Sequence, residues 1–120
     1  MKRNESKEDY LEAILKISME KNSCKSIDVA RLLNFSKPSV SVAMKKLKEE
    51  ELIIVEHDGN LILTEKGTQI AKNTLEKHEY LTDLFIKIGV EKSLAEEQAC
   101  EIEHSITEDT FEKLKAFLNK

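Results

Sequence analysis

Apolar residues recur at three- and four-residue spacing along most of this 120-residue chain. In residues 7–21, for example, this spacing places Tyr10, Leu11, Ile14 and Ile17 on one side of a helix, a pattern typical of amphipathic helices. A single proline and three glycines also favour a largely helical chain. The pattern predicts helices over residues 7–21, 27–33, 37–50, 65–88 and 108–118, and a further helix that carries residues 100–104.

A different pattern separates the third and fourth predicted helices. Two short β-prone runs, residues 52–55 and 61–63, flank a charged turn that contains Asp58, Gly59 and Asn60. Turn-forming residues between two apolar runs predict a β-hairpin. The expected fold class is therefore mainly α with one small β-hairpin.

Residues that can begin or end a helix stand at most of these boundaries. Hydroxyl side chains favour the N-cap position, proline is tolerated in the first turn, and glycine favours the position just after the last turn. The expected caps are Ser26, Ser36, Thr64 and Ser93 with its capping-box partner Glu96, while Pro38 falls in a first turn and Gly89 ends the long helix.

The order of helix, short helix, tight turn, helix and hairpin is that of a winged helix-turn-helix, whose second paired helix enters the DNA major groove. Small hydroxyl side chains on this helix suit base edges or phosphates, lysines suit phosphates, and a valine can contact a thymine methyl group. A merely solvated face of serine and lysine has the same composition, so that alternative remains open. The candidate DNA contacts are Lys37, Pro38, Ser39, Ser41, Val42, Lys45 and Lys46 on the helix, and Asn60 in the wing.

Composition and charge narrow the class of protein. Hydrophobic residues make up 40% of the chain and charged residues 35%, and no apolar run approaches the about 20 residues that a membrane helix needs. We expect a cytoplasmic protein with reduced cysteines and no membrane partner. The formal net charge of −4 is unevenly spread, because residues 1–72 carry 13 basic and 12 acidic residues whereas residues 73–120 carry 6 and 11.

The acidic part of the chain contains "CEIEH", in which Cys100, Glu103 and His104 share one helical face. An i, i+3 carboxylate pair, Asp9 and Glu12, stands on the first helix, and an imidazole, that of His78, stands on the long one. Thiolate, imidazole and carboxylate together form a ligand set for a first-row divalent metal rather than for calcium or magnesium. The simpler alternative is a buried apolar Cys100, a solvated Glu103, and a His104 that a neighbour satisfies.

The chain resembles a known family, the diphtheria-toxin-repressor and manganese-transport-regulator family of metal-dependent bacterial repressors. The resemblance covers nearly the whole chain in the same order, and it is carried by "SKEDYLEAI", "LNFSKPSVSVAMKKLKEEELI", "LILTEKG", "KHEYLTDLF" and "ACEIEH". It implies a winged helix-turn-helix DNA-binding domain over residues 1–64 and a helical metal-binding and dimerisation domain over residues 65–120, linked by the helix 65–88.

The resemblance also implies a set of metal ligands. It assigns Asp9, Glu12, His78, Cys100, Glu103 and His104, with Glu96 as a possible addition. The chain combines two branches of the family, because Asp9, Glu12 and His78 match the manganese regulators whereas Cys100 matches the iron-type repressors. Glu96 stands where iron-type members have a histidine, and Thr82 where they have a carboxylate.

We therefore expect a homodimeric repressor of metal-homeostasis genes that binds a double-stranded DNA operator when a metal bridges its two lobes. Fe(II) is expected first and Mn(II) next, with Co(II), Ni(II) or Zn(II) as substitutes in vitro. The first alternative is a metal-independent winged-helix dimer that senses an organic ligand or a protein. A metal-dependent hydrolase is disfavoured because no phosphate loop or nucleophile-and-base pair is visible, so we expect no enzyme and no small-molecule substrate. The expected dimer contact comprises Leu81, Leu84, Phe85, Ile88, Phe111, Leu114 and Phe117.

Overall fold

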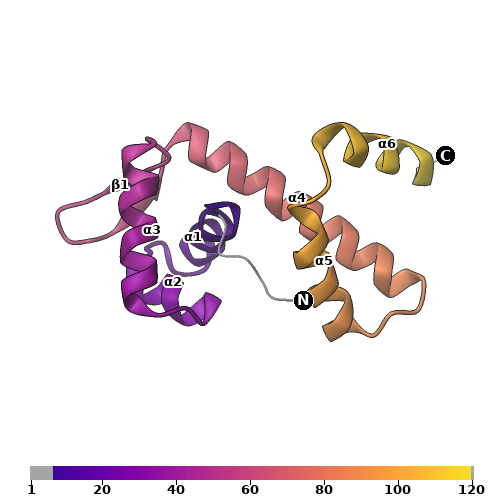
Figure 1. Cartoon of the computed structure of the whole chain (residues 1–120), viewed down its shortest axis with the longest axis horizontal. Helices are drawn as coiled ribbons and strands as arrows, with labels where there is room; N and C mark the ends of the chain where they lie inside the picture. Colours follow the sequence, from indigo (N-terminus) through magenta and orange to yellow (C-terminus); the bar gives the residue numbers. More distant parts are fainter. Residues whose placement is uncertain (1–6, 120) are drawn as a thin grey trace. The chain divides into compact units, whose positions relative to one another are not determined.

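The computed structural model describes residues 7–119, which form two compact units that divide between Asn73 and Thr74 (Figure 1). The division falls inside the longest helix, so this helix contributes to both units. None of the described helices is long and apolar enough to cross a membrane. The elements are α1 (Lys7–Lys21), α2 (Ser26–Leu33), α3 (Lys37–Glu49), β1 (Ile53–Val55), β2 (Leu61–Leu63), α4 (Glu65–Lys87), α5 (Lys92–Glu103) and α6 (Glu108–Leu118).

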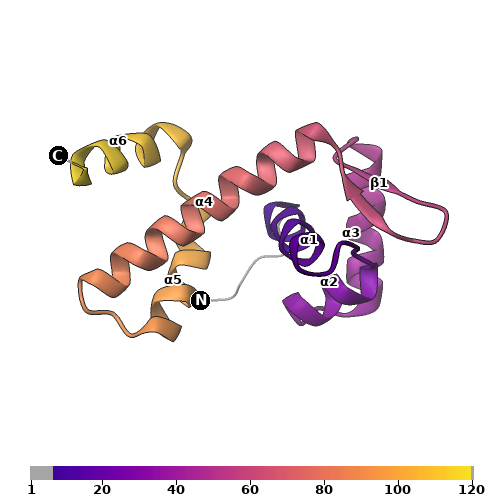
Figure 2. The ribbon, with the colours of Figure 1, turned by 180° about the vertical axis from the view of Figure 1, so that it is seen from behind.

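In the first unit, three helices and the hairpin surround one apolar core. Helix α2 packs against α1 and α3, while β1 packs on α3 and β2 on α1 (Figure 2). The inner face predicted for residues 7–21 is confirmed, because Tyr10, Leu11, Ile14 and Ile17 are buried. The core includes Leu11, Ile14, Ile17, Val29, Val40, Met44, Leu47, Leu52, Ile53 and Leu61.

The predicted hairpin is also confirmed. Its strands are antiparallel, and Ile53 lies opposite Leu63 while Val55 lies opposite Leu61. The turn between them contains Gly59 at a φ of 89°, a left-handed conformation that glycine adopts without strain. The hairpin follows α3 directly and forms the wing that the element order predicts.

The start of α4 is fixed to the end of the segment between α3 and β1. Thr64 caps the helix as expected, because its hydroxyl accepts from the N–H of Gly67 at 3.1 Å and donates to the carbonyl of Glu51 at 2.8 Å. A Cβ atom on Gly67 would collide with the backbone carbonyl of Leu52. The glycine of "LILTEKG" is therefore required by close backbone contact.

The second unit is held together by a smaller core. Leu81 of α4, Ala95 and Ala99 of α5, and Phe111 of α6 are buried. The ring of Tyr80 packs edge-on against Phe111, with 5.5 Å between ring centroids. This ring contact joins α6 to the C-terminal half of α4.

Two of the predicted caps are wrong. Ser26 is the first residue of α2, since Asp28 accepts from the N–H of Lys25 at 2.9 Å and makes Lys25 the cap. Helix α5 begins before Ser93, which donates its hydroxyl hydrogen to Glu91 at 3.1 Å and forms no capping box. The other predictions are confirmed: Ser36 caps α3, Pro38 lies in its first turn, and Gly89 follows α4 at a φ of 105°.

Candidate metal centre and nucleic-acid interface

The predicted DNA-reading residues of α3 form an accessible surface of the first unit. Val42, Lys45 and Lys46 are exposed, and Val42 retains 60% of its accessible area although it is apolar. Lys37, Pro38 and Ser41 are also exposed. This surface presents cationic, hydroxyl and apolar groups together, which is the mixture that phosphate and base contacts require.

Two hollows border this surface and include residues that were not predicted to contact DNA. A cavity of about 370 Å³ between α1 and α3 is lined by Ser39, Val42 and Lys46, and also by Lys7, whose ammonium pairs with Glu50 at 3.3 Å. A second hollow, of about 220 Å³, adds Ser26 and Ile27 of α2 to Lys37 and Ser41. Neither Lys7 nor Ser26 was expected to contact DNA, so only their position beside α3 identifies them.

Asn60 differs from the other candidates because the oxygen and the nitrogen of its side-chain amide both form hydrogen bonds within the first unit. Its Oδ1 accepts from the backbone N–H of Cys24 at 2.8 Å, and its Nδ2 donates to Glu56 at 3.0 Å. Lys25 holds the same turn, since its ammonium donates to the carbonyl of Asp58 at 2.8 Å. These contacts fix the wing against the segment that precedes α2.

We expect Asn60→Ala to lower the free energy of unfolding by about 1–3 kcal/mol, because the buried N–H of Cys24 loses its acceptor. Urea denaturation followed by circular dichroism measures this change. His57→Ala, at the exposed tip of the wing, is the matched control and should leave the stability nearly unchanged. Wild-type stability of Asn60→Ala combined with weaker DNA binding would instead assign Asn60 to a direct DNA contact.

In the second unit, the structure brings His78 of α4 to Glu103 at the end of α5. Nδ1 of His78 lies 3.2 Å from Oε1 of Glu103. When Nδ1 carries the proton, His78 donates to the carboxylate, which leaves Nε2 as the ring nitrogen of the type that binds a metal. Glu103 is only 1% exposed, and its second oxygen, Oε2, has no hydrogen-bond partner within the part of the chain that the structure describes. A buried carboxylate oxygen in this state favours a cation beside it.

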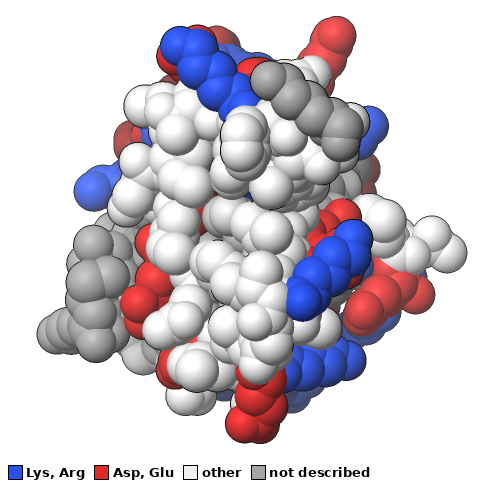
Figure 3. All heavy atoms as spheres, turned by 90° about the vertical axis from the view of Figure 1, so that its right-hand side faces the viewer, with Lys and Arg blue, Asp and Glu red and all other residues white. Residues whose placement is uncertain are grey.

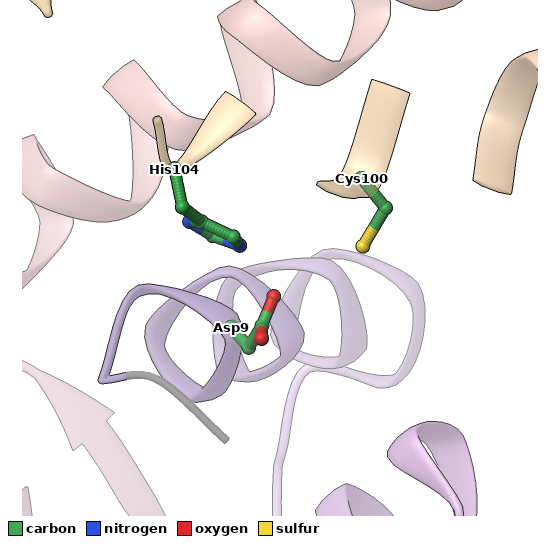
Figure 4. Close-up of side chains that lie close together, drawn as sticks. All are labelled: Asp9, Cys100 and His104. Carbon is green, nitrogen blue, oxygen red and sulfur yellow. The ribbon is translucent and has the colours of Figure 1, made fainter. Parts of the chain in front are cut away.

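Cys100 and His104 form a second donor pair on the same helix. The thiol sulfur and a ring nitrogen of His104 lie within 4.8 Å of each other. Figure 4 shows both side chains extending to the same side of α5. Both residues are partly buried, so a metal ion could reach them from solvent.

The first unit contributes two carboxylates on consecutive turns of α1. Asp9, labelled in Figure 4, is 1% exposed and Glu12 is 6% exposed. The ammonium nitrogen of Lys16, whose side chain is partly exposed, lies 3.9 Å from Oε2 of Glu12. Carboxylates are mostly solvated in proteins, so two buried ones on a single helix fit a cation-binding role.

The two cysteines lie in different environments. Cys24 is fully buried in the core of the first unit, and this burial, reinforced by the nearby Asp28, raises the pKa of its thiol to about 11. A metal ligand must be a thiolate, which Cys24 does not readily form. Cys100 is therefore the cysteine suited to metal binding.

The possible additional ligand, Glu96, is exposed, and it does not belong to the donor clusters found among residues 7–119. Thr82, on the turn of α4 that follows His78, has a buried hydroxyl without a hydrogen-bond partner within this same range. The structure thus groups the other donors of the second unit and leaves Glu96 outside.

The second unit also exposes apolar side chains. Figure 3 shows the side on which α6 and the end of α4 lie, where uncharged residues run through the centre and charged ones lie mostly around them. Ile88 and Phe117, both expected in a dimer contact, are about equally exposed, at 70% and 69%. Leu81 and Phe111 were expected there too, but this is wrong, because both are buried inside the unit. Ile86, Leu94 and Leu118 of the same unit are also exposed.

Comparison with known proteins connects both units to one family. Residues 3–61 match the iron dependent repressor N-terminal DNA binding domain, and residues 64–120 match the iron dependent repressor metal binding and dimerisation domain. The chain belongs to the iron-dependent repressor family. Members of this family are metal-dependent transcriptional regulators and not enzymes, so the resemblance inferred from the sequence motifs is confirmed.

Relatives cover the chain almost completely. An HTH-type transcriptional regulator of Methanocaldococcus jannaschii is 34% identical over 119 residues, covering 98% of this chain and 95% of the relative. The regulator MntR of Shouchella clausii is 33% identical over 109 residues, covering 91% and 76%. Family membership therefore rests on the entire sequence rather than on one motif.

Solved structures confirm the fold of a winged helix-turn-helix followed by a helical domain. T. acidophilum IdeR has a TM-score of 0.84 at 27% identity, and the manganese regulator SloR has a TM-score of 0.84 at 30% identity. Each comparison covers 99% of this chain, but only 56% of the IdeR chain and 55% of the SloR chain. The chain thus spans just over half the length of these two proteins.

Proposed function

We propose that the protein is a homodimeric repressor whose operator binding requires a divalent transition metal. The ligands we assign are Asp9 and Glu12 from the first unit, and His78, Cys100, Glu103 and His104 from the second. A bound cation supplies positive charge that offsets these carboxylates. Because side chains of both units take part, the metal-bound state fixes the DNA-reading unit relative to the dimerising unit.

The buried Oε2 of Glu103, without a hydrogen-bond partner among residues 7–119, is the observation that carries this proposal. The residue stands at the end of α5, beside His78 and one position from His104, so imidazole and carboxylate donors converge there. Burial of a carboxylate costs free energy unless a hydrogen bond or a cation compensates it. A metal ion compensates it, and this makes metal binding favourable.

The reading surface of α3 supports the DNA-binding part of the proposal. Two copies of the helix, separated by about one helical turn of DNA, 34–36 Å, would contact successive major grooves of a palindromic operator. The exposed apolar residues of the second unit, with Ile88 and Phe117 the most exposed, provide the face for the twofold dimer contact. We place this function in the cytoplasm, where the thiol of Cys100 stays reduced.

Lys45→Ala is expected to weaken binding to all DNA sequences about equally and to reduce the slope of log K against log salt by about one. The reason is that an exposed lysine on α3 contacts phosphate, which carries no sequence information. Affinities measured between 50 and 200 mM salt, on operator and unrelated duplexes, give the slope. Lys113→Ala, an exposed lysine of α6, is the matched control. An altered base preference with an unchanged slope would contradict the phosphate assignment.

Among the metals, we propose Fe(II) as the first physiological activator and Mn(II) as the second, with Co(II), Ni(II) and Zn(II) as substitutes in vitro. The thiolate of Cys100 favours iron, whereas the carboxylates of α1 favour manganese. An anaerobic titration of operator binding against Fe(II), Mn(II), Co(II) and Zn(II) tests the proposal. Equal operator binding with every metal and with a chelator would instead favour a metal-independent winged-helix dimer.

A further inference from the structure

Lys77, the residue before His78 on α4, has an environment that is unusual for a lysine. Its side chain is only 11% exposed, whereas lysine ammonium groups normally remain in water. The ammonium donates to the backbone carbonyl of Ile106 at 3.1 Å and pairs with Glu108 at 3.2 Å. Lys77 therefore joins α4 to the turn between α5 and α6.

This turn begins with a proposed metal ligand. Helix α5 ends at Glu103, His104 is its C-cap residue, and α6 begins at Glu108. The N–H groups of Ser105 and Ile106 donate to the carbonyl of Ile102 at 2.8 and 3.2 Å, which closes the turn. The carbonyl of Ile106 accepts a hydrogen bond from the ammonium of Lys77.

Two consecutive residues of α4 thus hold the same short segment at two places. His78 contacts the side chain of Glu103, and Lys77 contacts the backbone of Ile106. His104 lies between these two attachment points. With both contacts present, the end of α5 has little freedom to rotate or to unwind.

We propose that Lys77 is a positioning residue for the metal centre. By holding the turn after α5, it fixes the direction of the His104 imidazole relative to Cys100 and keeps Glu103 beside His78. Interactions that orient ligands in this way commonly affect metal affinity about 10–100-fold. The inference rests on the proposed function, since it assumes that His104 and Glu103 bind the metal.

Lys115 supplies a matched comparison within the same unit. Its ammonium pairs with Glu76 of α4 at 3.3 Å and lies 4.7 Å from the centre of the Phe111 ring. It therefore joins α6 to α4 as Lys77 does, but none of the residues it contacts here adjoins a proposed ligand. Loss of either lysine removes a contact between helices, and only loss of Lys77 releases the turn that begins with His104.

The experiment compares Lys77→Met, Lys77→Arg and Lys115→Met with the wild type. Three quantities are measured on the full chain: Co(II) affinity by competition with a chromogenic chelator, the visible absorption spectrum of bound Co(II), and the thermal midpoint without metal. We expect Lys77→Met to bind Co(II) about 10–100-fold more weakly and with an altered spectrum. Lys77→Arg, which keeps the donor and the charge, should recover most of the affinity. Lys115→Met should lower the thermal midpoint and leave the Co(II) affinity within about twofold of the wild type.

Three results would overturn the inference. The first is a Co(II) affinity and spectrum of Lys77→Met equal to those of the wild type. The second is an equal loss of affinity in Lys115→Met, which would attribute the effect to general destabilisation. The third is failure of the wild type itself to bind Co(II), which would refute the proposed metal centre rather than the role of Lys77 alone. Should Lys77→Met not fold, Lys77→Gln, whose amide is too short to reach Ile106, replaces it in the comparison.

Discussion

Removing the divalent metal with a chelator should reduce operator affinity to the level measured for unrelated DNA, a loss of about 10³-fold or more. Asp9, Glu12 and Glu103 are buried carboxylates, and burial of a carboxylate costs free energy that a bound cation offsets, so we expect the metal-free protein to disfavour the arrangement that binds the operator. The operator is first selected from a pool of random duplexes in the presence of Mn(II). Fluorescence anisotropy then compares the selected and scrambled duplexes with and without chelator, at constant ionic strength because phosphate contacts depend on salt.

A single substitution separates loss of the metal from other effects of the chelator. Glu103→Gln preserves the shape of the side chain but removes its charge. Loss of a residue that only orients a ligand typically weakens metal binding about 10–100-fold, and we expect Glu103→Gln to weaken metal-activated operator binding by more than this. Glu97→Gln changes an exposed carboxylate of the same helix and should behave like the wild type. If the Glu103→Gln variant were activated at the same metal concentration as the wild type, Glu103 would not be a ligand.

Most of the fold could be predicted because the apolar spacing in this chain is strong. The first unit has one core, and residues such as Leu11, Val40 and Leu47 lie on the faces that the spacing indicates. The wing was predictable for a different reason, since a turn with Asp58, Gly59 and Asn60 between apolar runs has few other solutions. Periodicity and turn chemistry are local properties, and the sequence displays both.

The error in the dimer contact arose because contacts between distant residues decide which apolar faces are buried within one chain. The spacing puts Leu81 and Phe111 on apolar faces, but it does not distinguish a face covered by the same chain from one covered by a second copy. In the structure Phe111 packs on Tyr80 and has no exposed surface with which to contact a second copy. The error at Ser93 has a local cause, because its hydroxyl donates to Glu91 two residues before it and the helix begins directly after Glu91.

In the candidate site, too, some features could be predicted from the local sequence and others depend on contacts between distant residues. The ligand types and their helical spacing were visible in the sequence, and the pairing of His78 with Glu103 is consistent with them. The role of Lys77 was not visible, because its partners, Ile106 and Glu108, are about 30 residues away along the chain and one of them acts through its backbone carbonyl. No residue pattern marks a carbonyl that a distant lysine satisfies.

Substitution of Cys100 should change which metal activates the protein. A thiolate is a softer ligand than a carboxylate, so Cys100→Glu should shift selectivity from Fe(II) towards Mn(II), which prefers oxygen ligands. Cys100→Ala removes a ligand and should weaken activation by every metal. Anaerobic competition titrations with Fe(II), Co(II) and Mn(II) on the wild type and both variants measure these shifts.

Cys24→Ala is the matched control for these titrations. Cys24 is buried away from solvent, and the raised pKa of its thiol, about 11, keeps it protonated at neutral pH. Its loss removes a side chain from the core of the first unit and should leave the order of metal affinities unchanged. If Cys100→Ala binds Fe(II) and Co(II) as tightly as the wild type and as Cys24→Ala, then Cys100 only packs as a small apolar residue. The ligand set would then consist of imidazole and carboxylate alone, and such a set suits Mn(II) better than a set that includes a thiolate.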